Sequence, residues 1–409
     1  MNVLCVTNDC PTPVMSGGDV RVLGLLRAMA SACSLHLLVS CDAKTAPSTG
    51  GRLAAEFGCT VELFPRNVSS VDVIAKATRW SRALLRGTPT WIDFYYNHEL
   101  VDRAVGTMRR WDAVVLLEDY SGVYARRLAA SRSCPIIADK HNVLGASVAL
   151  GKQRRGSGLL TARALLEARL VRNYECRYLR ATDAVVVTSE EEKGRLHRLY
   201  GRVADAVVPS AVDLLPRIAG KGDAGRVVWL GDLRYEPNVE GLARFVDSEW
   251  KWFGERGYRL DVIGQGSPPE RCWLGEQDGV RLMGFVETLS PVLAEATTAI
   301  VPLWRGAGVK VKTLTLMGYG LPVVATPVAL EGIVARDGVH ALIGRSPAEL
   351  ASQLRRLFED AALRARLGQA GRELVRRRYS WTNVGPTFVQ VVENAVTSFR
   401  EDGYRARIR

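Results

Sequence analysis

The chain has 409 residues, of which 47% are hydrophobic and 24% charged, a composition typical of globular proteins and not of disordered ones. This length exceeds that of one ordinary domain and predicts two. The formal net charge is +12 and both halves are basic. Such a balance favours anionic partners such as nucleotides, phosphates or acidic lipid head groups, although solvated surface charge alone also explains it.

The cysteines and the apolar runs indicate the compartment. None of the eight cysteines forms a C-x-x-C pair and most lie in apolar runs, which predicts reduced core thiols in a cytosolic protein. The N-terminal "MNVLCVTNDC" lacks the features of a signal peptide, and no apolar run approaches the about 18 residues of a membrane span. We therefore expect a cytoplasmic protein, and peripheral contact with the inner membrane surface stays open.

In the first half, short apolar runs alternate with amphipathic stretches. Strands are expected at 2–7, 34–40, 60–64, 112–118, 135–139, 183–189 and 205–209. Helices are expected at 19–32 and 159–179. This alternation predicts a parallel sheet with helices on both faces.

The pattern restarts after a segment rich in glycine, proline and charge. Strands are expected at 225–231, 258–264, 280–286, 298–303, 321–326 and 340–344, and helical stretches at 239–257, 289–296, 310–318, 346–379 and 383–399. We predict an α/β protein with two Rossmann-like domains. Their expected bounds are 1–212 and 213–380, with a C-terminal helix at 381–409 that returns to the first domain.

Two features follow strands of the first half. Gly17 and Gly18 lie in the turn after the first strand, where backbone N–H groups can approach a phosphate; a simple tight turn explains them equally. His141 follows the strand at 135–139, at the edge that lines the ligand crevice of open parallel sheets. A lone histidine is more often structural, and the other histidines form no zinc-ligand spacing with it.

Several motifs are missing from the sequence. There is no G-x-G-x-x-G with a following acid, no G-x-S-x-G, no G-x-x-x-x-G-K-[ST] and no H-E-x-x-H, which disfavours dinucleotide-binding sites, hydrolase elbows, Walker ATPases and zincins. No nucleic-acid-binding module is recognisable, so we expect no nucleic-acid partner.

Residues 76–86 carry four basic and no acidic side chains beside Trp80, Leu84 and Leu85. This composition suits an anionic lipid interface. An ordinary surface helix with its apolar stripe turned inward explains the same pattern.

The most informative stretch is "GVKVKTLTLMGYGLPVVAT" at 308–326. A glycine turn leads into a helix with Lys310 and Lys312 at its start, and a buried strand follows. Helix N-termini with nearby cations bind anions. The stretch therefore predicts an anion site.

The order of these motifs resembles the family-4-type retaining glycosyltransferases of the glycosyltransferase-B fold. The shared features are the Gly-Gly turn, "VVPSAVD" at 207–213, "WLGDLRYEPN" at 229–238 and "PLWRGAGVKVKTLTLMGYGLPVVATPVALEGI" at 302–333. The last is close to the family's P-L-x-x-G-x-G-x-[RK]-x-K-x-L-E-A-M-A-x-G-x-P-V-V-A-T. The resemblance covers almost the whole chain and implies two parallel sheets facing across a cleft, with the nucleotide-sugar donor held by the second domain and the acceptor by the first.

The resemblance also implies roles for individual residues. Lys312 and Arg234 would neutralise the donor diphosphate, His141 would contact the donor sugar, and Gly17 and Gly18 would meet the phosphates from the first domain. The other donor-binding residues implied are Gly284, Phe285, Val286, Arg305, Gly306, Ala307, Gly308, Val309, Lys310, Thr315 and Glu331. Such enzymes generally need no bound metal, so we expect neither metal nor cofactor.

Three positions depart from the family pattern. Ala307 and Thr315 stand where the family often has two glutamates, and Asn238 lies where it often has a lysine. Lys310 or Arg305 could compensate for that lysine. Because threonine cannot hold both ribose hydroxyls as a carboxylate does, we predict tolerance of, or preference for, a dTDP-sugar. The alternative is that Glu331 binds the ribose of a UDP- or GDP-sugar.

The sequence thus predicts a glycosyltransferase that moves a sugar from a nucleotide-diphosphate donor to an acceptor hydroxyl with retention of configuration. Two alternatives stay open: an inactive glycosyltransferase-like partner protein, and a nucleotide-sugar epimerase. The acceptor cannot be read from the sequence.

Overall fold

The computed structural model describes residues 1–12, 14, 16–42, 46–66, 73–146, 158–214, 225–266, 273–306 and 308–408. The chain divides into two compact units. The first unit comprises Met1–Pro209 and Gly385–Arg409, and the second comprises Ser210–Val384. The acceptor and donor roles of the two units stay predictions.

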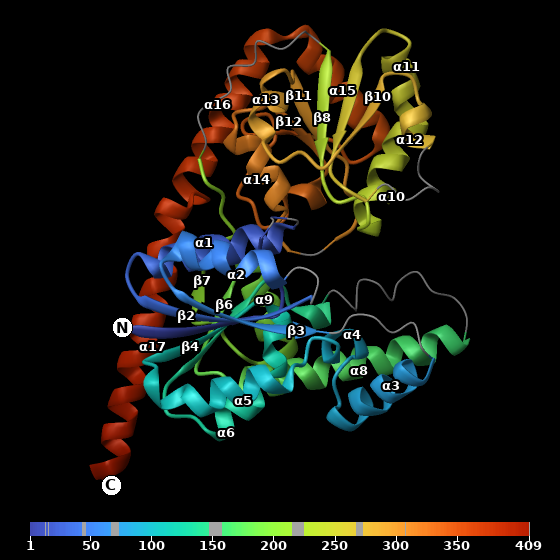
Figure 1. Ribbon diagram of the computed structural model, residues 1–409. Helices are drawn as coiled ribbons and strands as arrows, with labels where there is room; N and C mark the ends of the chain where they lie inside the picture. Colours follow the sequence, from blue (N-terminus) through green and yellow to red (C-terminus); the bar gives the residue numbers. More distant parts are fainter. Residues whose placement is uncertain are drawn as a thin grey trace. The chain divides into compact units, whose positions relative to one another are not determined.

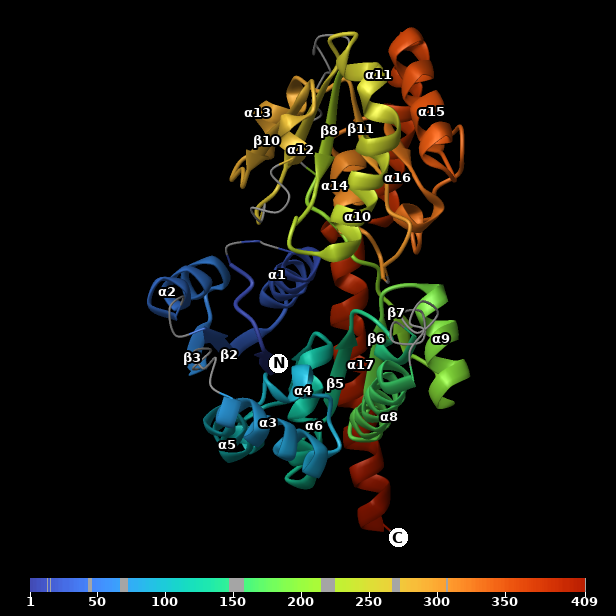
Figure 2. The same ribbon diagram turned by 90° about the vertical axis from the view of Figure 1, so that its right-hand side faces the viewer.

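Within its described residues, the first unit has one sheet of seven parallel strands in the order β3-β2-β1-β4-β5-β6-β7, with helices on both faces (Figures 1 and 2). The strands are β1 (Asn2–Thr7), β2 (Ser34–Asp42), β3 (Thr60–Arg66), β4 (Ala113–Leu117), β5 (Ile136–Lys140), β6 (Ala184–Val187) and β7 (Ala206–Val207). The strand order reverses between β1 and β4. Ligands of such sheets bind at the carboxyl ends of the strands beside this reversal.

Several helices of the first unit pack against the sheet. The described helices of this unit are α1 (Gly17–Ala30), α2 (Ala46–Phe57), α3 (Val73–Arg86), α4 (Thr90–Asp93), α5 (His98–Thr107), η1 (Met108–Arg110), η2 (Asp119–Val123), α6 (Ala125–Ala130), α8 (Gly158–Arg180) and α9 (Glu190–Tyr200). The core includes Leu4, Val114, Ile136 and Val185 of neighbouring strands. Strands buried on both faces explain why their sequences are continuous apolar runs.

The second unit repeats the architecture with a second core. Among its described residues, six parallel strands follow the order β10-β9-β8-β11-β12-β13 (Figure 2). They are β8 (Arg226–Leu230), β9 (Arg259–Ile263), β10 (Val280–Gly284), β11 (Thr298–Val301), β12 (Val323–Ala325) and β13 (Leu342–Ile343). The order reverses between β8 and β11. The prediction of two parallel α/β sheets is confirmed.

The helices of the second unit are α10 (Glu236–Phe245), η3 (Val246–Trp250), α11 (Lys251–Gly254), α12 (Trp273–Glu276), α13 (Leu289–Ala294), α14 (Val311–Gly318), η5 (Pro327–Leu330), α15 (Pro347–Glu359) and α16 (Ala361–Arg378). The stretch expected to be helical at 239–257 is α10 joined to α11 by a π-helical turn. The charged stretch at 346–379 forms two helices, because Asp360 accepts a hydrogen bond from the Leu363 N–H (2.8 Å) and starts α16.

The last helix is α17 (Trp381–Ile408), and the division between the units falls within it, next to Pro386. Its later part packs on the first unit. Gly385 lies so close to Ala28 of α1 that a Cβ added to it would be 2.7 Å from the Ala28 Cβ. Further along, Arg400 pairs with Asp112 at 2.5 Å.

The expectations about membrane spans and buried cysteines concern the whole chain. No helix in the described part of the chain is both long and apolar enough to span a membrane. Three of the cysteines, Cys5, Cys41 and Cys134, are buried, whereas Cys10, Cys33, Cys59 and Cys176 are only partly so, and all seven are free. Cys272 lies outside the described residues.

Candidate functional site

The loop before α14 supplies the predicted anion site of the second unit. Gly306 and Gly308 have φ values of 135° and 73°, which side-chain-bearing residues rarely adopt. These glycines turn the chain from the end of β11 into α14, whose N-cap is Lys310. The start of α14 therefore lies at the carboxyl edge of the sheet, beside the point where strand order reverses. Ala307, between the two glycines, lies outside the described residues.

Lys312 is a cation whose charge is not balanced locally. Its Nζ donates to Asn238 Oδ1 at 2.7 Å and lies 4.9 Å from the centre of the Trp229 ring. Burial, with the nearby charge of Lys310, lowers the pKa of Lys312 to about 7. Among the described residues no carboxylate pairs with it. An anion that came to this position would restore the charged form.

Lys310 has a different environment from Lys312. Its Nζ contacts Glu331 Oε2 at 3.2 Å and the Gly308 carbonyl at 2.5 Å, so it braces the glycine loop while its charge is balanced. The Thr315 hydroxyl donates to the Val311 carbonyl at 3.0 Å, within α14. The hydroxyl of Thr315 is therefore left as an acceptor towards any ligand.

The two arginines predicted at this edge are both held by carboxylates. Arg234 makes a fork on Asp232, with Nη2 to Oδ2 at 2.7 Å and Nε to Oδ1 at 3.0 Å, and it remains 58% exposed. Burial raises the pKa of Asp232, but the hydrogen bonds from Arg234 outweigh it and the pKa is lowered. Arg305 forms an ion pair with Glu240.

The residues expected at the nucleotide base also lie at this edge. Gly284 ends β10 with φ 68°, and its carbonyl accepts from the Gly264 N–H at 2.9 Å. Phe285 is 51% exposed, and Val286 and Val309 are partly exposed. An exposed phenylalanine beside a glycine turn can cover one face of a base.

The first unit places the predicted Gly18 and His141 together. A Cβ on Gly18 would lie 3.3 Å from Ser16 Oγ and 3.6 Å from His141 Nδ1, so glycine suits this close approach. The sequence predicted that Gly17 and Gly18 lie in a loop between strand and helix, and this was wrong. They form the start of α1 itself. The reason is a capping box: the Asp19 N–H donates to Ser16 Oγ at 3.2 Å, and the Ser16 N–H donates to Asp19 Oδ2 at 2.7 Å.

His141 is oriented by a buried ion pair. Its Nε2 lies 3.1 Å from Asp139 Oδ2, and Arg21 Nη2 lies 2.5 Å from Asp139 Oδ1. Burial opposes ionisation of Asp139, but Arg21 and His141 together lower its pKa to about 2. The side chain of His141 is 14% exposed, so the imidazole is held firmly while one side still meets solvent.

Glu118 joins the ends of β1 and β4, where strand order reverses. Its Oε1 accepts from the Thr7 hydroxyl at 2.7 Å and the Asn8 N–H at 2.8 Å. Its φ is 66°, the one positive value among described residues other than glycine. Burial raises the pKa of Glu118 to about 7, although the bond from Thr7 and the charge of His141 lower it. Backbone strain and a shifted pKa at a crevice are both features of functional residues.

A model of the family "Glycosyl transferases group 1" matches residues 224–360, which contain this edge of the second unit. Residues 224–360 therefore form a group 1 glycosyltransferase domain, and the chain is a glycosyltransferase.

Solved structures share the fold of this glycosyltransferase over nearly its whole length. Sucrose-phosphate synthase from Thermosynechococcus elongatus has 16% identity and a TM-score of 0.72, covering 97% of this chain and 100% of that one. Anabaena HepE in complex with UDP-glucose has 13% identity and a TM-score of 0.67, covering 96% and 100%. WaaG, a glycosyltransferase involved in lipopolysaccharide biosynthesis, has 15% identity and a TM-score of 0.63, covering 95% and 99%. A search of curated proteins found no match.

Within each unit of the glycosyltransferase, the structure brings most predicted residues to one sheet edge. In the second unit, Lys310 Nζ contacts the carbonyls of Gly306 and Gly308 and the carboxylate of Glu331. In the described residues no group of three or more histidines, cysteines or carboxylates could hold a metal ion.

Two residues were not found from the sequence, Asn238 in the second unit and Glu118 in the first. Asn238 was named only for its departure from the family pattern, and its bond to Lys312 spans 74 positions, so no local pattern reveals it. Glu118 followed an apolar run, "AVVLL", which was a usable signal, because acids at the ends of parallel strands point to the crevice.

Proposed function

We propose that the second unit binds the diphosphate of the nucleotide sugar between Lys312 and the first N–H groups of α14. The observation that carries this proposal is the Nζ of Lys312, a part-buried cation that has no carboxylate partner among the described residues. When the glycosidic bond to the donor breaks, negative charge develops on the leaving diphosphate. A fixed cation and helix N–H groups stabilise that charge more than they stabilise the bound donor.

Arg234 joins the diphosphate by exchanging one carboxylate contact for a phosphate contact. Its pair with Asp232 is exposed, and exposed pairs contribute only about 0–1 kcal/mol. A more highly charged phosphate can therefore compete with Asp232. Arg305 and Glu240 form a second exposed pair of the same kind, so Arg305 could make the same exchange.

On the first unit, His141 faces the donor sugar and Glu118 receives the acceptor hydroxyl. A carboxyl group whose pKa is about 7 exists in both protonation states near neutral pH. It can accept a hydrogen bond from the acceptor hydroxyl or take up its proton during transfer. The buried Asp139 keeps His141 in place for the sugar.

The preferred nucleotide depends on whether Thr315 or Glu331 lies at the ribose. Thr315 offers one oxygen, whereas Glu331 is a carboxylate next to the glycine loop, bound to Lys310. UDP-glucose is the ligand named for the similarly folded HepE, which supports a UDP-sugar with Glu331 at the ribose. A dTDP-sugar is the competing choice, because deoxyribose has no 2′-hydroxyl to bind.

The acceptor side also offers a surface for an anionic membrane. On α3, Trp80, Leu84 and Leu85 are 38%, 47% and 89% exposed, and the exposed Arg82 lies among them. Because Trp80, Leu84 and Leu85 are exposed, they are not part of an apolar stripe turned towards the core. An aromatic and two leucines beside cations fit the head-group region of the cytoplasmic leaflet.

The donor site is tested by calorimetric titration of UDP into wild type, Lys312→Gln and Lys251→Gln. We expect Lys312→Gln to weaken UDP about tenfold to a hundredfold, the loss of a charge-assisted bond of about 1.5–3 kcal/mol. Lys251 is solvated on α11, so Lys251→Gln should bind UDP as wild type does. Equal UDP affinity in all three proteins would remove Lys312 from the donor site.

The membrane surface is tested by flotation with vesicles of phosphatidylcholine and phosphatidylglycerol at low salt. Leu85→Ser should lower the bound fraction, whereas Leu199→Ser, an exposed leucine of α9, should not. Wild-type flotation by Leu85→Ser would rule this surface out.

A further inference from the structure

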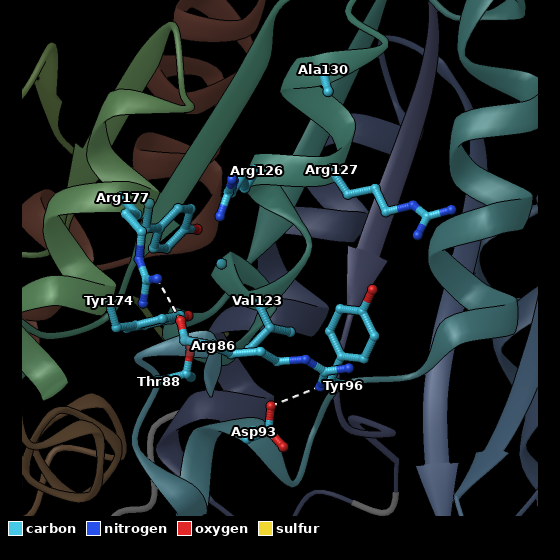
Figure 3. Close-up of a pocket in the computed structure, with 12 residues that line it drawn as sticks. Arg86, Thr88, Asp93, Tyr96, Val123, Arg126, Arg127, Ala130, Tyr174 and Arg177 are labelled. Carbon is cyan, nitrogen blue, oxygen red and sulfur yellow. Dashed lines mark hydrogen bonds and ion pairs between the residues drawn. The ribbon is translucent and has the colours of Figure 1, made fainter. Parts of the chain in front are cut away.

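The first unit contains a cavity of about 350 Å³ whose wall is rich in arginine (Figure 3). The end of α3, the segment around α4, η2, α6 and α8 all contribute to it. Four arginines and three tyrosines line this cavity, and Asp93 is the acidic residue among them. We call it the arginine cavity.

Two of the four arginines in the cavity are neutralised by carboxylates. Arg86 pairs with Asp93 at 2.8 Å, and Arg127 pairs with Asp102 of α5 at 2.7 Å. Figure 3 shows Arg127 extending away from Arg126, its neighbour along α6. The charges of Arg86 and Arg127 are therefore already balanced.

Arg126 and Arg177 have no carboxylate partner among the described residues. Arg177 donates to the neutral carbonyls of Arg86 (2.5 Å) and Gly87. Burial and then the charge of Arg126 lower the pKa of Arg177, so the two guanidinium groups repel each other. Their unbalanced charges share one cavity, and this arrangement favours an anion between them.

We propose that the arginine cavity binds a phosphate group carried by the acceptor, held by Arg126 and Arg177. A phosphate monoester has a charge of about −1.5 to −2 at neutral pH, which matches two unpaired guanidinium groups. The cavity is large enough for the phosphate and part of the molecule that carries it.

The position of the cavity connects it with the acceptor edge. The η2 helix lines it and directly follows Glu118 in the chain, and the Tyr174 hydroxyl donates to the Asp119 carbonyl at 2.5 Å. An acceptor bound by its phosphate in the cavity would approach the sheet edge along η2. This assignment rests on the proposed function, in which Glu118 receives the acceptor hydroxyl.

Titration with inorganic phosphate tests the cavity. All proteins carry Lys312→Gln, so that the donor edge of the second unit contributes as little phosphate binding as possible. Adding Arg126→Gln should raise the Kd for phosphate about tenfold or more, because one charge-assisted bond is lost. Adding Arg127→Gln is the matched control and should leave the Kd within about twofold. Equal effects of the two substitutions, or no phosphate binding before either, would overturn the proposal.

Vesicles then distinguish a lipid-linked phosphate from a soluble one. Flotation with phosphatidylcholine vesicles containing phosphatidic acid, lost on Arg126→Gln and competed by inorganic phosphate, would identify a lipid acceptor. Phosphate binding without such flotation would identify a soluble sugar phosphate. UDP binding by the wild-type protein is measured separately, so failure of the donor site and failure of the cavity give different results.

Discussion

At the strand-order reversal of the first sheet, Glu118 joins the ends of β1 and β4. Next to it, the Asp139 carboxylate pairs with the Arg21 guanidinium and the His141 imidazole. At the reversal of the second sheet, Lys312 contacts the amide Asn238 and no described carboxylate. The two edges share their topology and differ in how their charges are satisfied. At the first edge Asp139 is paired with two basic side chains, whereas at the second Lys312 has no carboxylate partner among the described residues. The group 1 family match falls on the second edge.

The largest difference should appear when one carboxylate is removed from each edge. Asp139→Asn leaves Arg21 buried without its counter-charge, which should lower the free energy of unfolding by about 3–5 kcal/mol. Asp232→Asn removes the partner of an exposed arginine and should cost less than about 1 kcal/mol. Thermal unfolding by calorimetry measures both. If the two variants lose the same stability, the contrast between the two edges is wrong.

The next effect is the pH dependence of UDP binding. The pKa of Lys312 is about 7 without ligand, and a bound diphosphate should raise it. Above pH 7 the free lysine is neutral and the bound one charged, so binding takes up a proton and affinity falls by up to about tenfold per pH unit between pH 7 and 9. Calorimetry in buffers of different ionisation enthalpy measures this uptake.

Lys312→Gln is the control for that titration, because glutamine does not titrate and the uptake should disappear. Proton uptake that is unchanged in Lys312→Gln would assign the linkage to another group. Wild-type binding without any uptake would show that the diphosphate does not reach Lys312.

A smaller effect is expected at Glu118. Its folded pKa of about 7 lies above the value of the unfolded chain, so the folded protein binds more protons between about pH 4.5 and 7. This contribution to stability is present at low pH and is lost as pH rises through 7.

Glu118→Gln removes this ionisation while its amide oxygen can still accept from Thr7 and Asn8. The variant should therefore be more stable than wild type by about 1–2 kcal/mol at pH 8, with little difference at pH 5. Its sugar transfer should fall, since glutamine cannot take a proton. Melting curves and turnover at both pH values test this, and wild-type turnover at pH 8 would make Glu118 purely structural.

The fold could be predicted because the central strands, such as β1, β4, β5 and β6, are buried apolar runs and each unit repeats the same alternation. The glycine loop could be predicted too, since Gly306 and Gly308 adopt conformations that favour glycine. What the sequence could not predict depends on distant contacts. The ion pair that holds Arg305 decides whether this cation is ready for a phosphate, and it joins Arg305 to Glu240 across 65 positions. The roles of the individual site residues stay predictions.

The smallest effect is expected from Thr315→Glu, which tests the nucleotide. The Thr315 hydroxyl donates within α14, so it leaves the ribose one acceptor, whereas a glutamate would offer two oxygens to the two ribose hydroxyls. If the native donor is a dTDP-sugar, Thr315→Glu should strengthen UDP by about 1 kcal/mol, roughly fivefold, and leave dTDP unchanged. If Glu331 already binds the ribose, a second carboxylate beside it would repel, and UDP binding should weaken instead. Titrations of UDP, GDP and dTDP into both proteins separate the cases. Wild-type binding of UDP or GDP tenfold tighter than dTDP would exclude the deoxyribose donor, and Glu331→Gln should then lose that preference.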